Sequence, residues 1–172
     1  AEQPLRSIHA SPSGTLVAAA ARSGEVALID VGSRAVRHRM TRHTREARAV
    51  RFLGDNRVAT FGLDRRICVW DSSGDLIWER RDEQSQFYTG DISPDGQTLA
   101  AGSLRGEVLL LETRTGNVVA RIPAHNDRVT MLRYLPGKNG LLSCSLDRTI
   151  RLWDLETGLP TDVFRPQGQT PK

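Results

Sequence analysis

Residues 148–154, RTIRLWD, form a short apolar segment that ends in an acid, and three similar segments precede it. They are GEVALID at 24–30, RRICVWD at 65–71 and GEVLLLE at 106–112. Intervals of 41, 41 and 42 residues separate the branched side chains at the same place in each copy, which are Val26, Ile67, Val108 and Ile150. Four copies in phase along a chain of 172 residues indicate a repeat architecture.

Each repeat is predicted to contain four short strands joined by turns. In the last repeat we expect strands at Val129–Leu135, Leu141–Ser145, Thr149–Asp154 and Thr161–Phe164. SPSG at 11–14 and SPDG at 93–96 are turn sequences, because Pro fixes φ and Gly accepts a positive φ. Short, evenly spaced strands, four to a repeat of about 41 residues, predict an all-β fold: a β-propeller of four-stranded antiparallel blades.

The pattern resembles the WD-repeat family over roughly residues 2–165, most clearly at Trp70-Asp71 and Trp153-Asp154. The resemblance implies a hydrogen-bonded tetrad: a His before the first strand, a Ser or Thr in the second, an Asp before the third and a Trp in the third. The matching residues are His43, Thr60, Asp64 and Trp70 in the second repeat, and His125, Ser143, Asp147 and Trp153 in the fourth. A His, a Ser and an Asp can also form a hydrolase triad, but the resemblance implies a buried structural role.

The first and third repeats depart from this pattern. Ser23 and Arg105 stand at the Asp position, and Ile29 and Leu111 stand at the Trp position. We therefore expect these two blades to lack the polar brace and to depend on apolar packing.

The predicted blades form one propeller domain, with ranges 1–41, 42–82, 83–123 and 124–165, followed by a flexible tail at 166–172. Members of the resembled family usually have about seven blades. We therefore expect a partial ring completed by further blades, or half of an eight-bladed dimer made with a second copy. A closed four-bladed ring is the third alternative.

Composition indicates a soluble globular protein, and the basic balance is explained either by a codon bias that favours arginine or by an anionic partner. Hydrophobic residues make up 38% of the chain and charged residues 26%, and no apolar run approaches the length of a membrane span. The formal net charge is +4, and all basic residues except Lys138 and Lys172 are arginines. Seven arginines lie between Arg34 and Arg51, which predicts either a solvated outer strand or a patch for an acidic protein segment or nucleic acid. Nucleic acid is the less favoured ligand, because no aromatic residues are interleaved with these arginines.

The candidate binding surface combines this stretch with the loops on which the resembled family usually binds ligands. Its residues are Arg37, Arg39, Arg42, Arg45, Arg48, Arg65, Arg105, Asn126 and Arg148.

No catalytic signature stands out in the sequence. Cys68 and Cys144 lie in different repeats without the spacing of a zinc site, so we expect neither a metal nor a cofactor. The resemblance implies a non-catalytic scaffold that binds protein partners and no membrane. The alternatives are a sensor or regulatory segment of a larger enzyme, or a nucleic-acid-binding module that uses the Arg34–Arg51 stretch. The cysteine usage slightly favours the cytoplasm, and the start at Ala1 without Met leaves an exported protein as the alternative.

Overall fold

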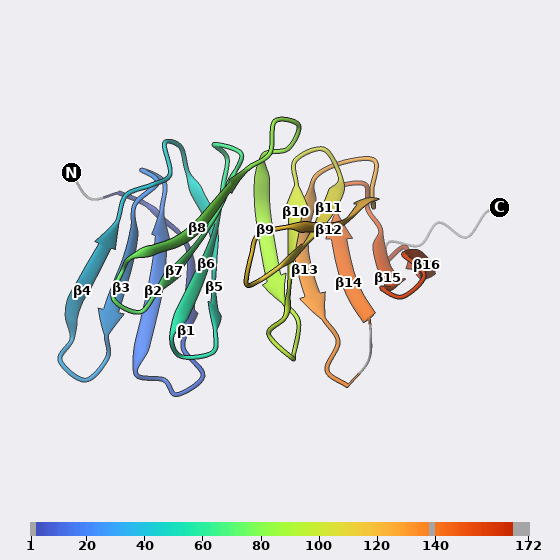
Figure 1. Ribbon diagram of the computed structural model, residues 1–172. Helices are drawn as coiled ribbons and strands as arrows, with labels where there is room; N and C mark the ends of the chain where they lie inside the picture. Colours follow the sequence, from blue (N-terminus) through green and yellow to red (C-terminus); the bar gives the residue numbers. More distant parts are fainter. Residues whose placement is uncertain (1–2, 138–139, 167–172) are drawn as a thin grey trace.

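The computed structural model describes residues 3–137 and 140–166, which form sixteen strands in four antiparallel four-stranded sheets (Figure 1). Blade 1 contains β1 (Leu5–Ala10), β2 (Leu16–Ala21), β3 (Val26–Asp30) and β4 (Ala35–Met40). Blade 2 contains β5 (Ala47–Leu53), β6 (Arg57–Gly62), β7 (Arg66–Asp71) and β8 (Leu76–Arg81). Blade 3 contains β9 (Phe87–Ile92), β10 (Thr98–Ser103), β11 (Glu107–Glu112) and β12 (Val118–Pro123). Blade 4 contains β13 (Val129–Tyr134), β14 (Gly140–Ser145), β15 (Ile150–Asp154) and β16 (Leu159–Phe164).

The predicted fold class is confirmed: the described residues contain only strands and their connections, arranged as part of a β-propeller. The sequence predicts a flexible tail at 166–172. Of these residues, 167–172 lie outside the described part of the chain. No helix in the part of the chain that the structure describes is long and apolar enough to cross a membrane.

The first strand of each blade lies at the inner edge of the arc. Within every sheet the strands are hydrogen-bonded in chain order, and β1, β5, β9 and β13 contact one another from blade to blade. Each of these inner strands carries a β-bulge at the same place. The bulged residues are Arg6, Arg48, Tyr88 and Thr130. A bulge redirects its side chain, so these four positions form an equivalent set along the inner edge.

Apolar side chains fill the spaces between neighbouring blades. Leu28 and Val50 belong to the core between blades 1 and 2, and both are fully buried. Phe61 of blade 2 packs toward blade 3, where a Cβ at Gly90 would lie 2.3 Å from the Phe61 Cζ atom. The tight approach explains why glycine stands in the middle of β9, although glycine weakens a strand.

The two ends of the arc expose apolar residues at positions that are buried between blades. Ile8 follows the bulge of β1 by two residues and is 66% exposed, whereas the equivalent Val50 is fully buried. Met131 follows the bulge of β13 by one residue and is 49% exposed, whereas the equivalent Ala49 is 4% exposed. The outer faces of blades 1 and 4 therefore have the character of blade-to-blade interfaces, and no neighbouring blade covers them among residues 3–137 and 140–166.

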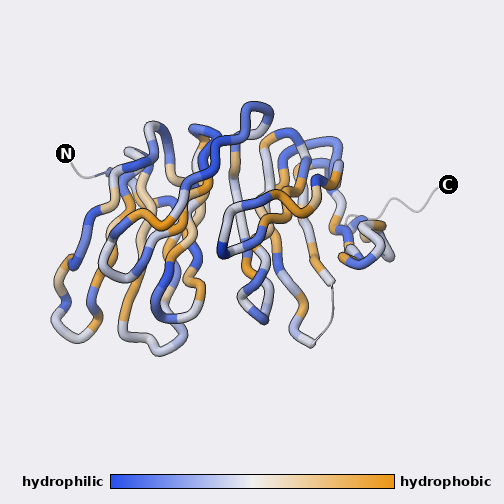
Figure 2. The backbone as a smooth tube through the Cα atoms, viewed as in Figure 1, coloured by the Kyte–Doolittle hydropathy of each residue, from blue (hydrophilic) through white to orange (hydrophobic). Residues whose placement is uncertain are grey.

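The connections between the blades, together with the turns between the second and third strands of each blade, form one face of the arc, here called the upper loop face. Figure 2 shows that these connections, at the top of the view, are mostly hydrophilic. The segments of this face are 22–25, 41–46, 63–65, 82–86, 104–106, 124–128 and 146–149.

Candidate interaction surface

The four tetrad positions of blade 2 are within hydrogen-bonding distance of one another. The Nδ1 atom of His43 lies 2.9 Å from a carboxylate oxygen of Asp64, and its Nε2 atom lies 2.8 Å from the Thr60 hydroxyl. The Trp70 indole N–H donates to the same hydroxyl oxygen at 3.1 Å. Because a carboxylate only accepts, Nδ1 carries the imidazole proton, and Nε2 accepts from Thr60.

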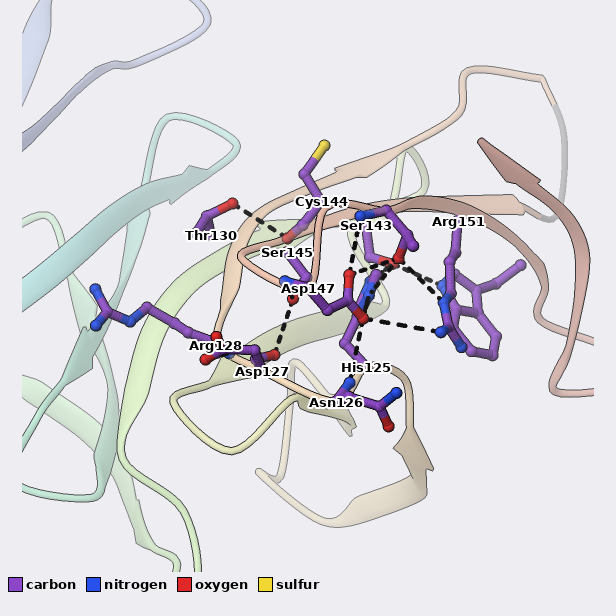
Figure 3. A network of polar contacts seen from close by, with 12 residues as sticks. His125, Asn126, Asp127, Arg128, Thr130, Ser143, Cys144, Ser145, Asp147 and Arg151 are labelled. Atoms are coloured by element: carbon purple, nitrogen blue, oxygen red, sulfur yellow. Dashed lines mark hydrogen bonds and ion pairs between the residues drawn. The ribbon is translucent and has the colours of Figure 1, made fainter. Parts of the chain in front are cut away.

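Blade 4 repeats this arrangement with Ser in place of Thr. His125 lies 2.9 Å from an Asp147 oxygen and 2.7 Å from the Ser143 hydroxyl, to which the Trp153 indole N–H donates at 2.8 Å. Thr149 adds a hydroxyl that donates to the Asp147 carboxylate at 2.6 Å. Figure 3 shows this network gathered around Asp147 and His125.

The connectivity of these networks is that of a hydrolase triad, but their surroundings differ from those of an active site. The side chains of His43 and His125 are both fully buried, and the hydroxyl of each set is already bonded to an indole N–H. A substrate carbonyl has no path to these hydroxyls.

The pKa values of both tetrad aspartates are lowered, which favours their ionised form. Burial would raise the pKa of Asp64, but the hydrogen bond from His43 and those from backbone N–H groups lower it overall. In blade 4, burial lowers the pKa of His125 more than the contact with Asp147 raises it. In blade 4 the pair is therefore a hydrogen bond from a neutral imidazole to a carboxylate at neutral pH.

The expectation that blade 3 depends on apolar packing alone is wrong. Arg121 of β12 forms ion pairs with Asp82 and, at 3.1 Å, with Glu107. Ser85, which is fully buried, donates to Glu107 at 2.6 Å, and Asp82 accepts the Ser85 backbone N–H at 2.9 Å. This charged network joins the loop before β9 to β11 and β12, the third and fourth strands of the blade, whereas a tetrad joins the equivalent loop to the second and third strands.

The arginines between 34 and 51 do not form one surface. Arg37 and Arg39 of β4 are paired with Asp30 and Glu25, and Arg42 is paired with Glu79. Arg48 lies in β5, at the inner edge of the arc rather than on an outer strand. The predicted patch is therefore divided between the inner strand β5 and the outer strand β4 with the loop that follows it. On β4 and that loop, acidic residues of this chain already pair with Arg37, Arg39 and Arg42.

The remaining candidate residues lie on the upper loop face. Arg45, Arg105 and Arg148 are exposed, and no ion pair involves them among residues 3–137 and 140–166. Arg65 donates to the Glu83 backbone carbonyl at 3.1 Å and to its carboxylate at 3.2 Å. Asn126 is exposed, and its backbone N–H donates to Asp147.

Two shallow, polar depressions open on the upper loop face. Arg65 contributes to both of them. The first is lined by Arg65, Glu83, Gln84, Gln86, Leu104 and Arg105. The second is lined by Thr44, Arg45, Leu63, Asp64, Arg65, Arg66 and Arg81. Within the described residues, no three His, Cys, Asp or Glu side chains come together as metal ligands.

Sequence comparison matches one repeat of this chain to a known family. The model of the family "WD domain, G-beta repeat" matches residues 116–154. The chain is 28% identical to periodic tryptophan protein 2 of Arabidopsis thaliana over 92% of its own length and 19% of that protein's. It is 31% identical to actin-interacting protein 1 of Drosophila melanogaster over 59% of its own length and 17% of that protein's. It is 28% identical to echinoderm microtubule-associated protein-like 3 of Mus musculus over 59% of its own length and 11% of that protein's.

Residues 116–154 thus match a WD repeat, and the chain is similar to WD-repeat proteins over most of its length. It spans less than a fifth of the length of each of these three relatives.

Proposed function

We propose that this chain is a non-catalytic scaffold that binds protein partners on its upper loop face. The observation that carries the proposal is the burial of its tetrads: the residues able to perform acid–base chemistry are enclosed and hydrogen-bonded to one another. Binding of proteins is also the role implied by the name of one relative, actin-interacting protein 1. Fold alone would not support this, because one fold hosts many functions.

The tetrads act as braces in this proposal. His43 precedes β5, Thr60 lies in β6 and Trp70 lies in β7, so their hydrogen bonds join a loop to two strands. Breaking one of these bonds should lower the free energy of unfolding and leave the exposed binding residues in place.

The exposed arginines of the upper loop face are the proposed contacts. Arg45, Arg105 and Arg148 are free of ion pairs in the described chain and can form bidentate contacts with carboxylates of a partner. The alternative, a nucleic-acid module built on the Arg34–Arg51 stretch, is less supported because Arg37, Arg39 and Arg42 already pair with acids of this chain. A regulatory segment of a larger enzyme would use the same binding face.

We also propose that the outer faces of blades 1 and 4 are covered by further blades or by a second copy. The exposure of Ile8 and Met131, at positions buried elsewhere in the repeat, supports this arrangement. The mass in solution tests it: a stable dimer of this 19.0 kDa chain supports a second copy, and a monomer that binds apolar dyes supports further blades. A monomer without dye binding contradicts both.

Affinity capture tests the scaffold. The immobilised chain should recover a protein from an extract of its own organism, and the variant Arg45→Glu/Arg105→Glu should lose it. A matched control, Arg34→Glu/Arg114→Glu, reverses two exposed charges in the β3–β4 and β11–β12 turns and should retain it. Recovery of no protein by the unaltered chain, or equal recovery by all three, contradicts the proposal.

A further inference from the structure

The positive charge of this protein is concentrated at the inner edge of the arc. The four inner strands carry four arginines (Arg6, Arg48, Arg51 and Arg133) and one acid (Asp91), an excess of +3 in a chain whose net charge is +4. Arg22, Glu46 and Arg128 of the adjacent loops lie beside them. This inner-edge cluster consists of Arg6, Arg22, Glu46, Arg48, Arg51, Asp91, Arg128 and Arg133, together with the aromatic ring of Tyr88.

One carboxylate serves three guanidinium groups in the upper part of the cluster. Glu46 lies 3.1 Å from Arg6, 3.3 Å from Arg22 and 3.1 Å from Arg48. A single negative charge cannot neutralise three positive ones, so these four side chains together keep a net positive charge that favours the binding of anions.

Tyr88 holds two arginines at the same place. The guanidinium carbon of Arg48 lies 4.0 Å from the centre of the Tyr88 ring, and that of Arg128 lies 4.8 Å from it. Cation–π contact stabilises both groups. The Nε atoms of Arg48 and Arg128 are buried and have no hydrogen-bond partner in the described chain. Figure 3 shows the Arg128 side chain extending away from the network of His125 and Asp147.

A second charged layer lies further along the inner strands. Asp91 of β9 is placed between Arg51 of β5, at 3.6 Å, and Arg133 of β13, at 3.4 Å. Arg133 has a half-exposed side chain, so its charge faces solvent. The two layers together are here called the basic strip of the inner edge.

Recognition at this strip must come from side chains. The backbone N–H groups of Val50 and Phe52 on β5 donate to Ser7 and His9 of the preceding blade. The backbone N–H of Tyr134 on β13 donates to Asp91. Because these donors are occupied, a partner cannot simply extend β5 or β13 by β-augmentation.

We propose that the inner-edge cluster binds an acidic segment of a partner protein, with carboxylates of that segment contacting Arg48 and Arg128. The inference rests on the proposed scaffold function and names the chemistry of the partner. The guanidinium groups are already ordered by Tyr88 and Glu46, so binding costs less side-chain entropy than at a free surface. A peptide fits better than single-stranded nucleic acid, because the Tyr88 ring already contacts two guanidinium groups and is not a free platform for a base.

Fluorescence anisotropy tests the proposal with a short labelled peptide of alternating Glu and Ser. The unaltered chain should bind this peptide, bind the matching Gln–Ser peptide much more weakly, and lose affinity as salt is raised. Arg48→Gln/Arg128→Gln should weaken binding by about tenfold or more. The matched control Arg34→Gln/Arg114→Gln removes the same charge elsewhere and should bind as the unaltered chain does.

Three results would overturn the inference. These are an equal loss in the control, no loss in Arg48→Gln/Arg128→Gln, and tighter binding of a single-stranded oligonucleotide of similar charge than of the peptide. The scaffold proposal fails separately: it fails when the unaltered chain captures no partner, whereas this inference alone fails when a captured partner is indifferent to Arg48→Gln/Arg128→Gln. Thermal unfolding of each variant confirms that it is folded.

Discussion

The hydroxyl of Thr60 offers the sharpest test of the proposed brace. Thr60 is fully buried, and its oxygen bonds both to His43 Nε2, at 2.8 Å, and to the Trp70 indole N–H, at 3.1 Å. Thr60→Val keeps the shape of the side chain and removes that oxygen. The change therefore leaves one buried acceptor and one buried donor without a partner.

The expected cost follows from these two orphaned groups. A buried polar group without a partner costs about 1–3 kcal/mol, so Thr60→Val should lower the free energy of unfolding by roughly 2–4 kcal/mol. Blade 3 has no such hydroxyl: Ala101 stands at the position equivalent to Thr60. Leu111 replaces the tryptophan there, so no buried indole N–H requires an acceptor.

Urea unfolding followed by tryptophan fluorescence measures the effect. With a slope of about 2 kcal/mol per molar urea, the midpoint should fall by roughly 1–2 M. Thr60→Ser retains the hydroxyl and is the matched control. In a double-mutant cycle with Trp70→Phe, the second change should cost less when Thr60 is already Val, since the indole N–H is then an orphan. A shift in free energy below about 0.5 kcal/mol, with the cycle additive, would refute this account of the brace.

Three further predictions concern other contacts. Gly106→Ala should lower the free energy of unfolding in urea by about 2–4 kcal/mol, because the added Cβ would lie 2.0 Å from the His125 carbonyl oxygen. The control Gly14→Ala has open space around it and a φ of +72°, so it should cost about 1 kcal/mol; equal costs would contradict this. Arg121→Met should lower the urea midpoint by an amount equivalent to about 1–2 kcal/mol, because it removes the cation beside the buried Asp82 carboxylate, and an unchanged midpoint would show that the blade 3 network contributes nothing. Burial lowers the pKa of His125, so the unfolded chain binds this proton more readily and stability should fall as the pH drops below the ordinary value of 6.5; a urea midpoint that rises with acid would have the wrong sign.

Period and spacing carried most of the fold prediction. A 41-residue period placed sixteen strands, because each blade buries the same apolar positions against its neighbours. The same period located the hydrogen-bonding residues of blades 2 and 4, since Asp64 and Trp70 stand at fixed places relative to the strands.

The charged contacts could not be predicted in this way. Arg121 of β12 pairs with Asp82 of the β8–β9 connection, 39 residues earlier in the chain. No recurring spacing in the sequence indicates that contact. The prediction of one basic patch at Arg34–Arg51 failed for a related reason. A run of like charges does not indicate which acidic residues the fold places beside it, such as Glu79 next to Arg42. The sequence did not predict the contacts of Tyr88, because the two arginines that lie over its ring come from other parts of the chain.

Variation at one repeated position separates the residues that make the fold from those that can make a contact. Positions facing a neighbouring blade stay apolar from copy to copy, as Val26, Ile67 and Val108 do, because each must fill the same space. The bulged position of the inner strands has the same geometry in every blade, yet it holds arginine in blades 1 and 2, tyrosine in blade 3 and threonine in blade 4. Packing imposes no single residue there. Arg48 and Tyr88 at this position, together with Arg128 of the loop before β13, make up the centre of the cluster that we propose binds an acidic segment.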